Sequence, residues 1–523
     1  MKINKESLEW LNTNKLYNQW VSKKEIRNFF SNNVCYEGLS LWWISRVVGK
    51  DNVIENQWYY ELKKILHHST VEFRYNWLVF FLKLIKNLFK NFIDLIYFKL
   101  VNFFCNSSIK KRNLNYENCF HSFSYNFKKF NNNYSDRLYG KAPFLNLKKN
   151  FYLITAKDRK LSLFKKKIID YYISNAYLGC IDFLKIYFIT LCKLVHVKKF
   201  LDNNSHLFII NKIDCSSVLK PLIFDSFCGY IQNSLIEALS IKNFLKNKKV
   251  NNFICYGEFH SGYRAVYYFV KKTCSHINIA TIHHGYANEN LLFFNHKKEE
   301  FNLKYEEGKN CSPMPDQYFV QGVQFKNILK KYYPKKISII GCLKYDFVKF
   351  KKQKNKIKKT LKTLKIVVAP SIGDEKDILL YLKELSHKNK IDVKNIQFYL
   401  SPHPVIKKKT IEVYKKNLPG IKLLIPDKTT LEITRKCDLL ICGFSTVAYE
   451  AALIGKPSLR VINSNSPILF HVKDEINKIY NVKEFLNEVK KKKHKLANRK
   501  KIEKYFYYKL DGNAAKRFWK QIN

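Results

Sequence analysis

The chain has 523 residues, 46% of them hydrophobic, and a formal net charge of +52. This length is enough for two or three domains with a sizeable core. The positive charge is compatible with a nucleic-acid, membrane or phosphorylated partner, and also with a coding bias, because Lys and Asn are abundant throughout. A specific nucleic-acid partner is not expected, since the chain has no zinc finger, no RRM-type motif and no basic stripe interleaved with aromatic residues.

The thirteen cysteines are scattered singly along the chain, and no CxxC pair occurs. The N-terminal residues lack the apolar segment of a signal peptide. Reduced thiols in the cytoplasm are therefore the simplest interpretation.

Residues 76–104 carry the strongest membrane signal. Their apolar run is interrupted every three to five residues, so that the polar positions gather largely on one side of a helix: Lys83, Lys86, Lys90, Asp94, Lys99 and Asn102. Lysines near the middle of a membrane span are costly, which favours a helix lying in the membrane interface with its lysines toward lipid phosphates. An amphipathic helix packed on the protein core is the alternative.

Residues 107–150 are rich in Asn, Lys and Tyr and are interpreted as a variable insertion or linker. From about residue 150, apolar runs at 150–156, 250–258 and 277–285 alternate with helical patterns. Strands that alternate with helices predict βαβ units and a parallel sheet.

The C-terminal half has the clearer alternation. Six apolar runs with short helices between most of them predict a doubly wound domain: 337–341, 365–371, 396–404, 422–426, 438–444 and 458–462. The glycines form neither GxGxxG nor GxxxxGK[ST], so the sequence lacks the dinucleotide-binding and P-loop motifs.

The stretch "LLICGFSTVAYEAALIGKPSLRV" stands out in this half. Gly443 allows a tight exit from a strand, and Ser445 or Thr446 caps the helix that follows. The free N–H groups at a helix N-terminus favour anions, the two hydroxyls could donate to a diphosphate, and Glu450 could reach a ribose. The alternative is a well-capped helix whose Glu450 is merely solvated.

A second candidate is "SPHP" at 401–404, where His403 precedes a proline that holds it extended at a strand end. Because ligands of open α/β sheets bind beyond the carboxyl ends of the strands, this imidazole could contact a phosphate leaving group. A lone histidine at a strand end is, however, more often structural.

The third candidate combines "GEFHSGYR" with "IHHGYANEN". Glu258, His260, His283 and His284 could supply a general base near an acceptor hydroxyl. A metal site is the alternative, but the spacing matches no strong metal motif such as HExxH, and no metal is expected.

Together, "SPHP", "CGFSTVAYEAALIGKPSLRV", "IHHG" and "IIGCLKYD" resemble GT-B glycosyltransferases of bacterial surface polysaccharide synthesis. The nearest groups are the polysialyltransferase-like and CDP-glycerol transferase-like enzymes, and a surface carbohydrate biosynthesis family with an early "SLWW" motif, here Ser40 to Trp43. The resemblance covers roughly 250–520 and is weak over 50–240.

This resemblance implies a GT-B fold, with two Rossmann-like doubly wound domains facing a cleft. The expected division is 1–315 on the acceptor side, including 76–104 and 107–150, then 316–500 on the nucleotide-donor side, then a closing helix in 501–523 that returns to the N-terminal domain.

The resemblance also assigns roles to residues. It implies that His403 contacts the donor phosphates and that Gly443, Ser445 and Thr446 cradle them. Glu450 would contact the ribose.

On the acceptor side, Glu258 or His284 would be the catalytic base, although "YGEF" does not reproduce the acidic pair that polysialyltransferases carry before Gly. The resemblance favours direct displacement with inversion, which needs no metal and no cofactor beyond the nucleotide-activated sugar.

The sequence thus predicts a glycosyltransferase that uses a nucleotide-sugar donor and a lipid-linked or growing surface glycan, such as capsule or O-antigen of lipopolysaccharide, as acceptor. It would be cytoplasmic and peripheral on the inner face of the bacterial cytoplasmic membrane, bound to an anionic membrane surface. The alternatives are a nucleotide-sugar 2-epimerase of the same architecture and a non-catalytic GT-B-like scaffold in polysaccharide assembly.

Overall fold

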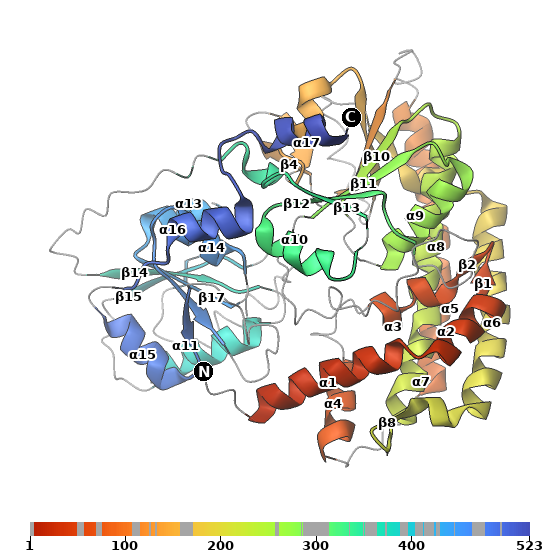
Figure 1. Cartoon of the computed structure of the whole chain (residues 1–523), viewed down its shortest axis with the longest axis horizontal. Coiled ribbons are helices and arrows are strands. Elements are labelled where there is room, and N and C mark those ends of the chain that lie inside the picture. The colour runs from red at the N-terminus through yellow and green to blue at the C-terminus, as the bar shows by residue number, and fades with distance from the viewer. Residues whose placement is uncertain are drawn as a thin grey trace. The chain divides into compact units, whose positions relative to one another are not determined.

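The structure is a computed structural model of the whole chain (Figure 1). It describes residues 5–49, 57–68, 76–106, 116–124, 127–130, 133–136, 138–156, 171–256, 261–283, 285, 313–333, 335–348, 350, 363–371, 374–387, 396–402, 412, 423–424, 429–443, 445–462, 476–491 and 494–522. Within these residues it contains two parallel sheets with helices between their strands, which confirms the predicted α/β class.

The first sheet has seven strands in the order β13-β12-β11-β10-β3-β6-β7, and every neighbouring pair is parallel. Its strands are β3 (Asn118–Phe123), β6 (Asn150–Thr155), β7 (Tyr171–Ile173), β10 (Asn252–Cys255), β11 (Asn278–Ile282), β12 (Gln317–Val320) and β13 (Lys336–Ile339). The order runs outward from β3 in one direction and from β10 in the other, so the sheet is doubly wound.

The interpretation of 107–150 as an insertion or linker is wrong for β3, which is an interior strand of the first sheet, between β10 and β6. This strand carries His121 and Ser122 between apolar residues, and both are buried. Their polar side chains make the segment look like a loop in the sequence, but buried hydrogen bonds satisfy them within the sheet.

A ladder of side-chain amides runs along the amino-terminal edge of this sheet. Asn252 donates to Asn118 and Asn118 donates to Asn150, both at 2.9 Å, while Asn278 donates to Asn252 at 2.9 Å. Gln317 continues the ladder toward Asn278 at 3.5 Å. The four asparagines are also register partners on neighbouring strands, so the ladder fixes the register of β6, β3, β10 and β11.

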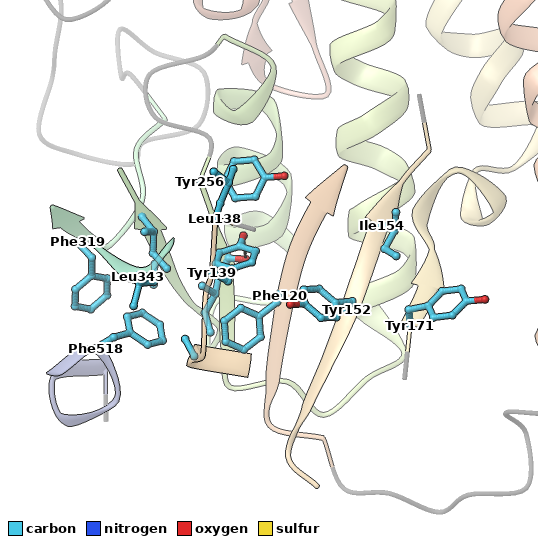
Figure 2. Packing of buried hydrophobic residues seen from close by; sticks show 14 of the residues in the cluster. Phe120, Leu138, Tyr139, Tyr152, Ile154, Tyr171, Tyr256, Phe319, Leu343 and Phe518 are labelled. Carbon is cyan, nitrogen blue, oxygen red and sulfur yellow. Dashed lines mark hydrogen bonds between the residues drawn. The ribbon is translucent and has the colours of Figure 1, made fainter. Parts of the chain in front are cut away.

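The core of this sheet is closed by the C-terminal helix α17 (Ala514–Ile522), as Figure 2 shows for Phe518 beside Phe319 and Phe120. The ring centroids of Phe518 lie 5.0 Å from Phe319 and 6.4 Å from Phe120. The carboxylate of Asp346 accepts hydrogen bonds from the first two backbone N–H groups of α17 at 3.0 and 2.8 Å. Burial raises the pKa of Asp346, and these two N–H groups partly offset that rise.

The second sheet has six strands in the order β16-β15-β14-β17-β18-β19, again all parallel. Its strands are β14 (Leu364–Ala369), β15 (Ile396–Leu400), β16 (Leu423–Leu424), β17 (Leu439–Cys442), β18 (Ser458–Val461) and β19 (Asn477–Ile479). The prediction that 337–341 belongs to this sheet is wrong, because this run forms β13, which pairs with β12 in the first sheet. The sixth strand is β19.

The chain divides into two compact units. The first-sheet unit comprises Asn12–His284, Leu292–Val348 and Leu510–Asn523, and the second-sheet unit comprises Met1–Leu11, Gly285–Leu291 and Lys349–Lys509. The change of unit therefore falls near Lys349, after β12 and β13, rather than at the expected 315/316. Of the expected closing segment 501–523, the part from Leu510 belongs to the first-sheet unit.

The longer helices follow in chain order: α1 (Lys5–Val21), α2 (Lys24–Asn33), α4 (Gln57–His68), α5 (Trp77–Asn106), α6 (Cys180–Asn203), α7 (Ser216–Asp225), α8 (Ile231–Lys246), α9 (Ser261–Thr273), α10 (Val323–Lys330), α11 (Glu375–His387), α13 (Thr430–Lys436), α14 (Val447–Leu453) and α15 (Val482–Lys490). Shorter helices are α3 (Arg46–Gly49) and α16 (Arg499–Ile502). The expected helix over 76–104 is thus present as α5. No helix in the described part of the chain is both long enough and apolar enough to span a membrane.

The "SLWW" motif has a structural place in this unit. Leu41–Ile44 form a single 3-10 turn, and both tryptophans are buried. The guanidinium of Arg264, from α9, lies 5.7 Å from the ring of Trp43. The motif therefore packs against α9.

The amide ladder yields a test of stability. We expect Asn118→Ala to lower the free energy of unfolding by about 1–3 kcal/mol, because it leaves the ladder amides of Asn252 and Asn150 without their buried partner. Urea denaturation of the whole protein measures the effect. Asn33→Ala is the matched control, since Asn33 is exposed at the end of α2 and bonds only its own helix among described residues; an equal loss in both variants would contradict the ladder's role.

Candidate functional site

The strand order of the second sheet places a switch point between β14 and β17. From β14 the chain proceeds outward through β15 and β16, and it then returns to β17 on the other side of β14. Ligands of open parallel sheets bind outside the carboxyl ends of the strands at such a point. The residues that follow these two strands are Pro370 and Ser371 after β14, and Gly443 and Ser445 after β17.

Gly443 is packed against a buried carboxylate. A Cβ at this position would overlap the side chain of Asp374, which is 1% exposed and comes directly before α11. Asp374 accepts a hydrogen bond from the backbone N–H of Ser371 at 2.6 Å. Glycine is needed here because the carboxylate approaches the loop after β17 closely, a constraint that the sequence analysis did not foresee.

Arg460 supports the same loop by hydrogen bonds to its backbone. This residue of β18 is fully buried, and its Nη1 donates to the carbonyl oxygens of Gly443 at 2.6 Å and Ser445 at 3.2 Å. Its guanidinium also lies 5.0 Å from the ring of Tyr449. A buried arginine with such partners fixes the loop geometry. An arginine inside the apolar run "SLRV" was the sequence signal for it.

The loop leads directly into α14. Thr446 is the N-cap residue, but its side chain makes no capping bond, whereas the Ser445 hydroxyl accepts from the N–H of Val447 at 3.4 Å. The helix ends at Gly455 with a φ of +77°, where the N–H of Lys456 donates to Ala451. Gly455, in the left-handed region of backbone conformation, thus stops this helix.

Glu450 lies in the first turn of α14 and is half-buried. Gly443, Ser445, Thr446 and Glu450 are therefore held within one loop and the first turn of one helix at the switch point. Their expected contacts with a donor nucleotide stay a prediction.

His403 lies outside the described residues, as do Glu258, His260 and His284. The residue before "PHP", Ser401, follows β15; its N–H donates to the carbonyl of Val368 on β14 at 2.8 Å. The Ser401 hydroxyl also lies 2.7 Å from the Thr430 hydroxyl at the start of α13. The motif thus begins at the strand next to β14.

The first sheet has its own switch point, between β3 and β10. The hydroxyl of Tyr256, directly after β10, accepts from the N–H of Phe123 at 3.1 Å and lies 3.1 Å from the Ser122 hydroxyl. Ser122 also donates to the fully buried carboxylate of Asp136. Glu258 follows Tyr256 by two residues in the sequence.

A buried hydrogen-bonded chain connects the strand ends beside this point. The two ring nitrogens of His121 lie 2.8 Å from the Tyr263 hydroxyl and 2.9 Å from the Thr155 hydroxyl, which in turn lies 2.8 Å from that of Ser174. Burial raises the pKa of Tyr263, so its hydroxyl stays protonated. The network links β3, β6 and β7 with α9, and the sequence analysis missed it because it took 107–150 for an insertion.

A polar cavity of about 140 Å³ lies at the carboxyl ends of β6 and β7. Its lining comes from α5, the strand ends, α6 and α8: Lys90, Asn91, Asp94, Leu95, Thr155, Ala156, Ser174, Asn175, Phe183, Asn233, Ile236, Glu237 and Ser240. Pockets for drug-sized ligands measure about 300–1,000 Å³, so this cavity suits a small polar group rather than a nucleotide. It shares Thr155 and Ser174 with the buried chain.

His283, which follows β11, is buried in the first-sheet unit. The backbone N–H of His283 donates to the carbonyl of Phe319 at 2.8 Å, and the centroid of its imidazole ring lies 4.2 Å from that of the Phe325 ring. This environment assigns His283 to packing rather than to an exposed base.

Comparisons with known proteins give distant likeness only. No family model and no curated protein sequence matches the chain. Among solved structures, it is similar to UDP-GlcNAc 2-epimerase from Neisseria meningitidis bound to UDP-GlcNAc, with 15% identity, 77% of this chain and 99% of that chain covered, and a TM-score of 0.42.

Two further structures show the same level of likeness. One is MnaA from S. aureus with UDP, at 14% identity, 78% and 96% coverage and a TM-score of 0.43. The other is MurG from Acinetobacter baumannii, at 12% identity, 77% and 95% coverage and a TM-score of 0.35. Because these TM-scores are low, the account of the two sheets rests on their own topology.

The contact between Gly443 and Asp374 can be tested by one methyl group. We expect Gly443→Ala to lower the free energy of unfolding by about 1–3 kcal/mol, because its Cβ would displace a buried carboxylate. Gly262→Ala is the matched control: in α9 its Cβ would meet only the Ser234 hydroxyl, at an ordinary 3.5 Å. Denaturant unfolding that shows Gly443→Ala as stable as the wild type would contradict this packing.

Proposed function

We propose that the chain is a glycosyltransferase that transfers a sugar from a nucleotide-activated donor to a lipid-linked or growing surface glycan. One observation carries the proposal: the Gly443, Ser445 and Thr446 loop, singled out from the sequence, follows β17 at the switch point of the second sheet. Residue chemistry and strand order thus point to the same loop.

The donor diphosphate would bind at this loop. Helix α14 begins at the carboxyl edge of the second sheet, so its N-terminal backbone N–H groups favour negative charge there, whereas the N-terminus of α11 directly follows the buried carboxylate of Asp374. The hydroxyls of Ser445 and Thr446 would add donors, and Glu450, one turn into α14, would accept from the ribose hydroxyls. His403, three residues after β15 in the sequence, would supply a further donor to the phosphates.

The acceptor would bind at the first sheet, with Glu258 or His284 as the base. These residues follow the neighbouring strands β10 and β11 in the sequence. The base would remove the proton from the acceptor hydroxyl. At the same time the hydroxyl oxygen of the acceptor would form a bond to the anomeric carbon, and the bond from that carbon to the diphosphate would break. Helix N–H groups and His403 would stabilise the charge that develops on the departing phosphate.

The donor site is tested by thermal unfolding with CMP, CDP, UDP, GDP and dTDP. We expect one nucleotide to raise the melting temperature by about 3–5 °C when it is in large excess over its dissociation constant. His403→Ala and the pair Ser445→Ala with Thr446→Val should each remove most of this rise. Ser216→Ala, a hydroxyl removed at the start of α7, is the matched control and should keep it.

Two results would count against this assignment. A wild-type chain that responds to none of the nucleotides would favour the scaffold alternative. A rise that persists unchanged in both site variants would place the nucleotide elsewhere.

Transfer is distinguished from 2-epimerisation by omitting the acceptor. The wild-type chain is incubated, without acceptor, with a sugar derivative of the nucleotide identified by melting. We expect the proton NMR spectrum to show that the configuration of the sugar is unchanged. Adding a lipid-linked glycan extract should release free nucleotide, and Glu258→Gln or His284→Ala should reduce this release by about 100-fold or more. Accumulation of the free 2-epimer without acceptor would establish the epimerase instead.

A further inference from the structure

Helix α5 has an unusual distribution of side chains, because polar residues on its inner side hold it to the protein. Asn87 donates to the carbonyl of Cys228 at 2.5 Å, and Asn91 donates to Tyr187 at 2.9 Å and to Asn233 at 2.6 Å. These two asparagines are one helical turn apart, so they mark the face that packs on the first-sheet unit.

Large apolar side chains occupy the opposite face of α5. The exposed ones recur at intervals of three and four residues over almost its whole length: Leu78, Phe81, Leu82, Ile85, Phe89, Phe92, Ile93, Ile96, Leu100 and Phe103. This spacing forms one continuous stripe along a helix. A stripe of this size on the surface of a soluble chain marks an interaction site.

Helix α6 carries a second stripe with the same spacing: Ile181, Leu184, Phe188, Leu191 and Val195 are all exposed. The two helices touch where the ring of Phe92 lies 5.8 Å from that of Phe183, beside the bond from Asn91 to Tyr187. Figure 1 shows α5 and α6 in the helical part of the first-sheet unit. The sequence analysis considered α5 alone, so the α6 stripe is new.

Lysines accompany both stripes. Each helix has four, and they are exposed or half-exposed: Lys83, Lys86, Lys90, Lys99, Lys185, Lys193, Lys198 and Lys199. Against these eight stand three acids on the same helices, Asp94, Asp182 and Asp202, and Asp225 of α7. Lys83 pairs with Asp225 at 3.5 Å and Lys198 with Asp202 at 2.9 Å, which leaves six of the lysines without an ion pair to any described residue. Apolar side chains flanked by lysines match the boundary between acyl chains and phosphate headgroups, where long lysine side chains reach outward to phosphates.

We propose that the exposed faces of α5 and α6 together dock on the surface of an anionic phospholipid bilayer. A second copy of the chain would fit this surface poorly, because a symmetric pair would bring the same lysines together between two molecules of charge +52. A nucleic acid would match the lysines but leave the apolar stripes exposed. The helix α5, about 45 Å long, lies along the bilayer surface.

Lys90, Asn91 and Asp94 of α5 line the polar cavity on the inner side of this helix, opposite the apolar stripe. The docking surface itself rests on α5 and α6 and does not depend on the nucleotide site.

Vesicle flotation of the full chain tests the proposal. The wild type is expected to float with vesicles of phosphatidylcholine and phosphatidylglycerol, and much less with phosphatidylcholine alone. Phe89→Glu on α5 and Phe188→Glu on α6, at residues that are 62% and 71% exposed, should each raise the lipid concentration for half-binding by about tenfold or more. Leu380→Glu, at a residue 52% exposed on α11 of the other unit, is the matched control and should bind as the wild type.

Phe89→Ser and Phe188→Ser repeat the test without added charge, and melting curves confirm that each variant is folded. Wild-type binding to phosphatidylcholine alone with equal affinity, absence of binding, or a Phe188→Glu chain that binds as the wild type would each overturn the proposal. The proposal would also be overturned if the wild type were a dimer, the variants were monomers, and neither bound vesicles. The melting temperature of every variant is also measured with and without the stabilising nucleotide. A variant that loses vesicle binding but keeps the nucleotide-induced rise in melting temperature separates this surface from the donor site.

Discussion

The amide ladder at the amino-terminal edge of the first sheet is the interaction on which this unit depends most. Each asparagine of the ladder both donates and accepts, so a slip of one strand would leave several buried or half-buried amides without partners. Fixing the register at one edge aligns the opposite, carboxyl edge as well, and it is there that His121, Thr155 and Tyr256 meet. The abundance of Asn, which composition alone attributes to coding bias, has a structural use at these positions.

Much of the second sheet could be predicted because its strands are short, apolar and separated by helices with clear ends. The position of the Gly443 loop followed from that pattern. Its internal support did not, because Asp374 and Arg460 reach the loop from parts of the chain that are distant in sequence. Periodicity indicates which face of an element is buried, but not which distant polar group contacts a loop. The sequence therefore explains Gly443 by a tight turn, whereas in the structure the close approach of the Asp374 carboxylate requires a glycine.

The first-sheet unit was harder to predict for a related reason. β3 carries polar residues that only its neighbours satisfy, and that strand was mistaken for a linker. Helix α5 shows the same limit in another form. Its sequence establishes two faces, but not which one packs inward, since that depends on whether the protein supplies hydrogen-bond partners. Tyr187, Cys228 and Asn233 supply them, which turns the apolar face outward.

The two candidate regions differ in their lining. The cavity at β6 and β7 measures about 140 Å³, less than a nucleotide needs, and its lining mixes amides, hydroxyls and carboxylates suited to a sugar or a headgroup. The switch point of the second sheet instead offers the N-terminus of α14 beside hydroxyls. If the outward apolar faces of α5 and α6 bind a bilayer, as proposed, transfer to a lipid-linked acceptor makes use of them, whereas epimerisation of a soluble nucleotide sugar does not.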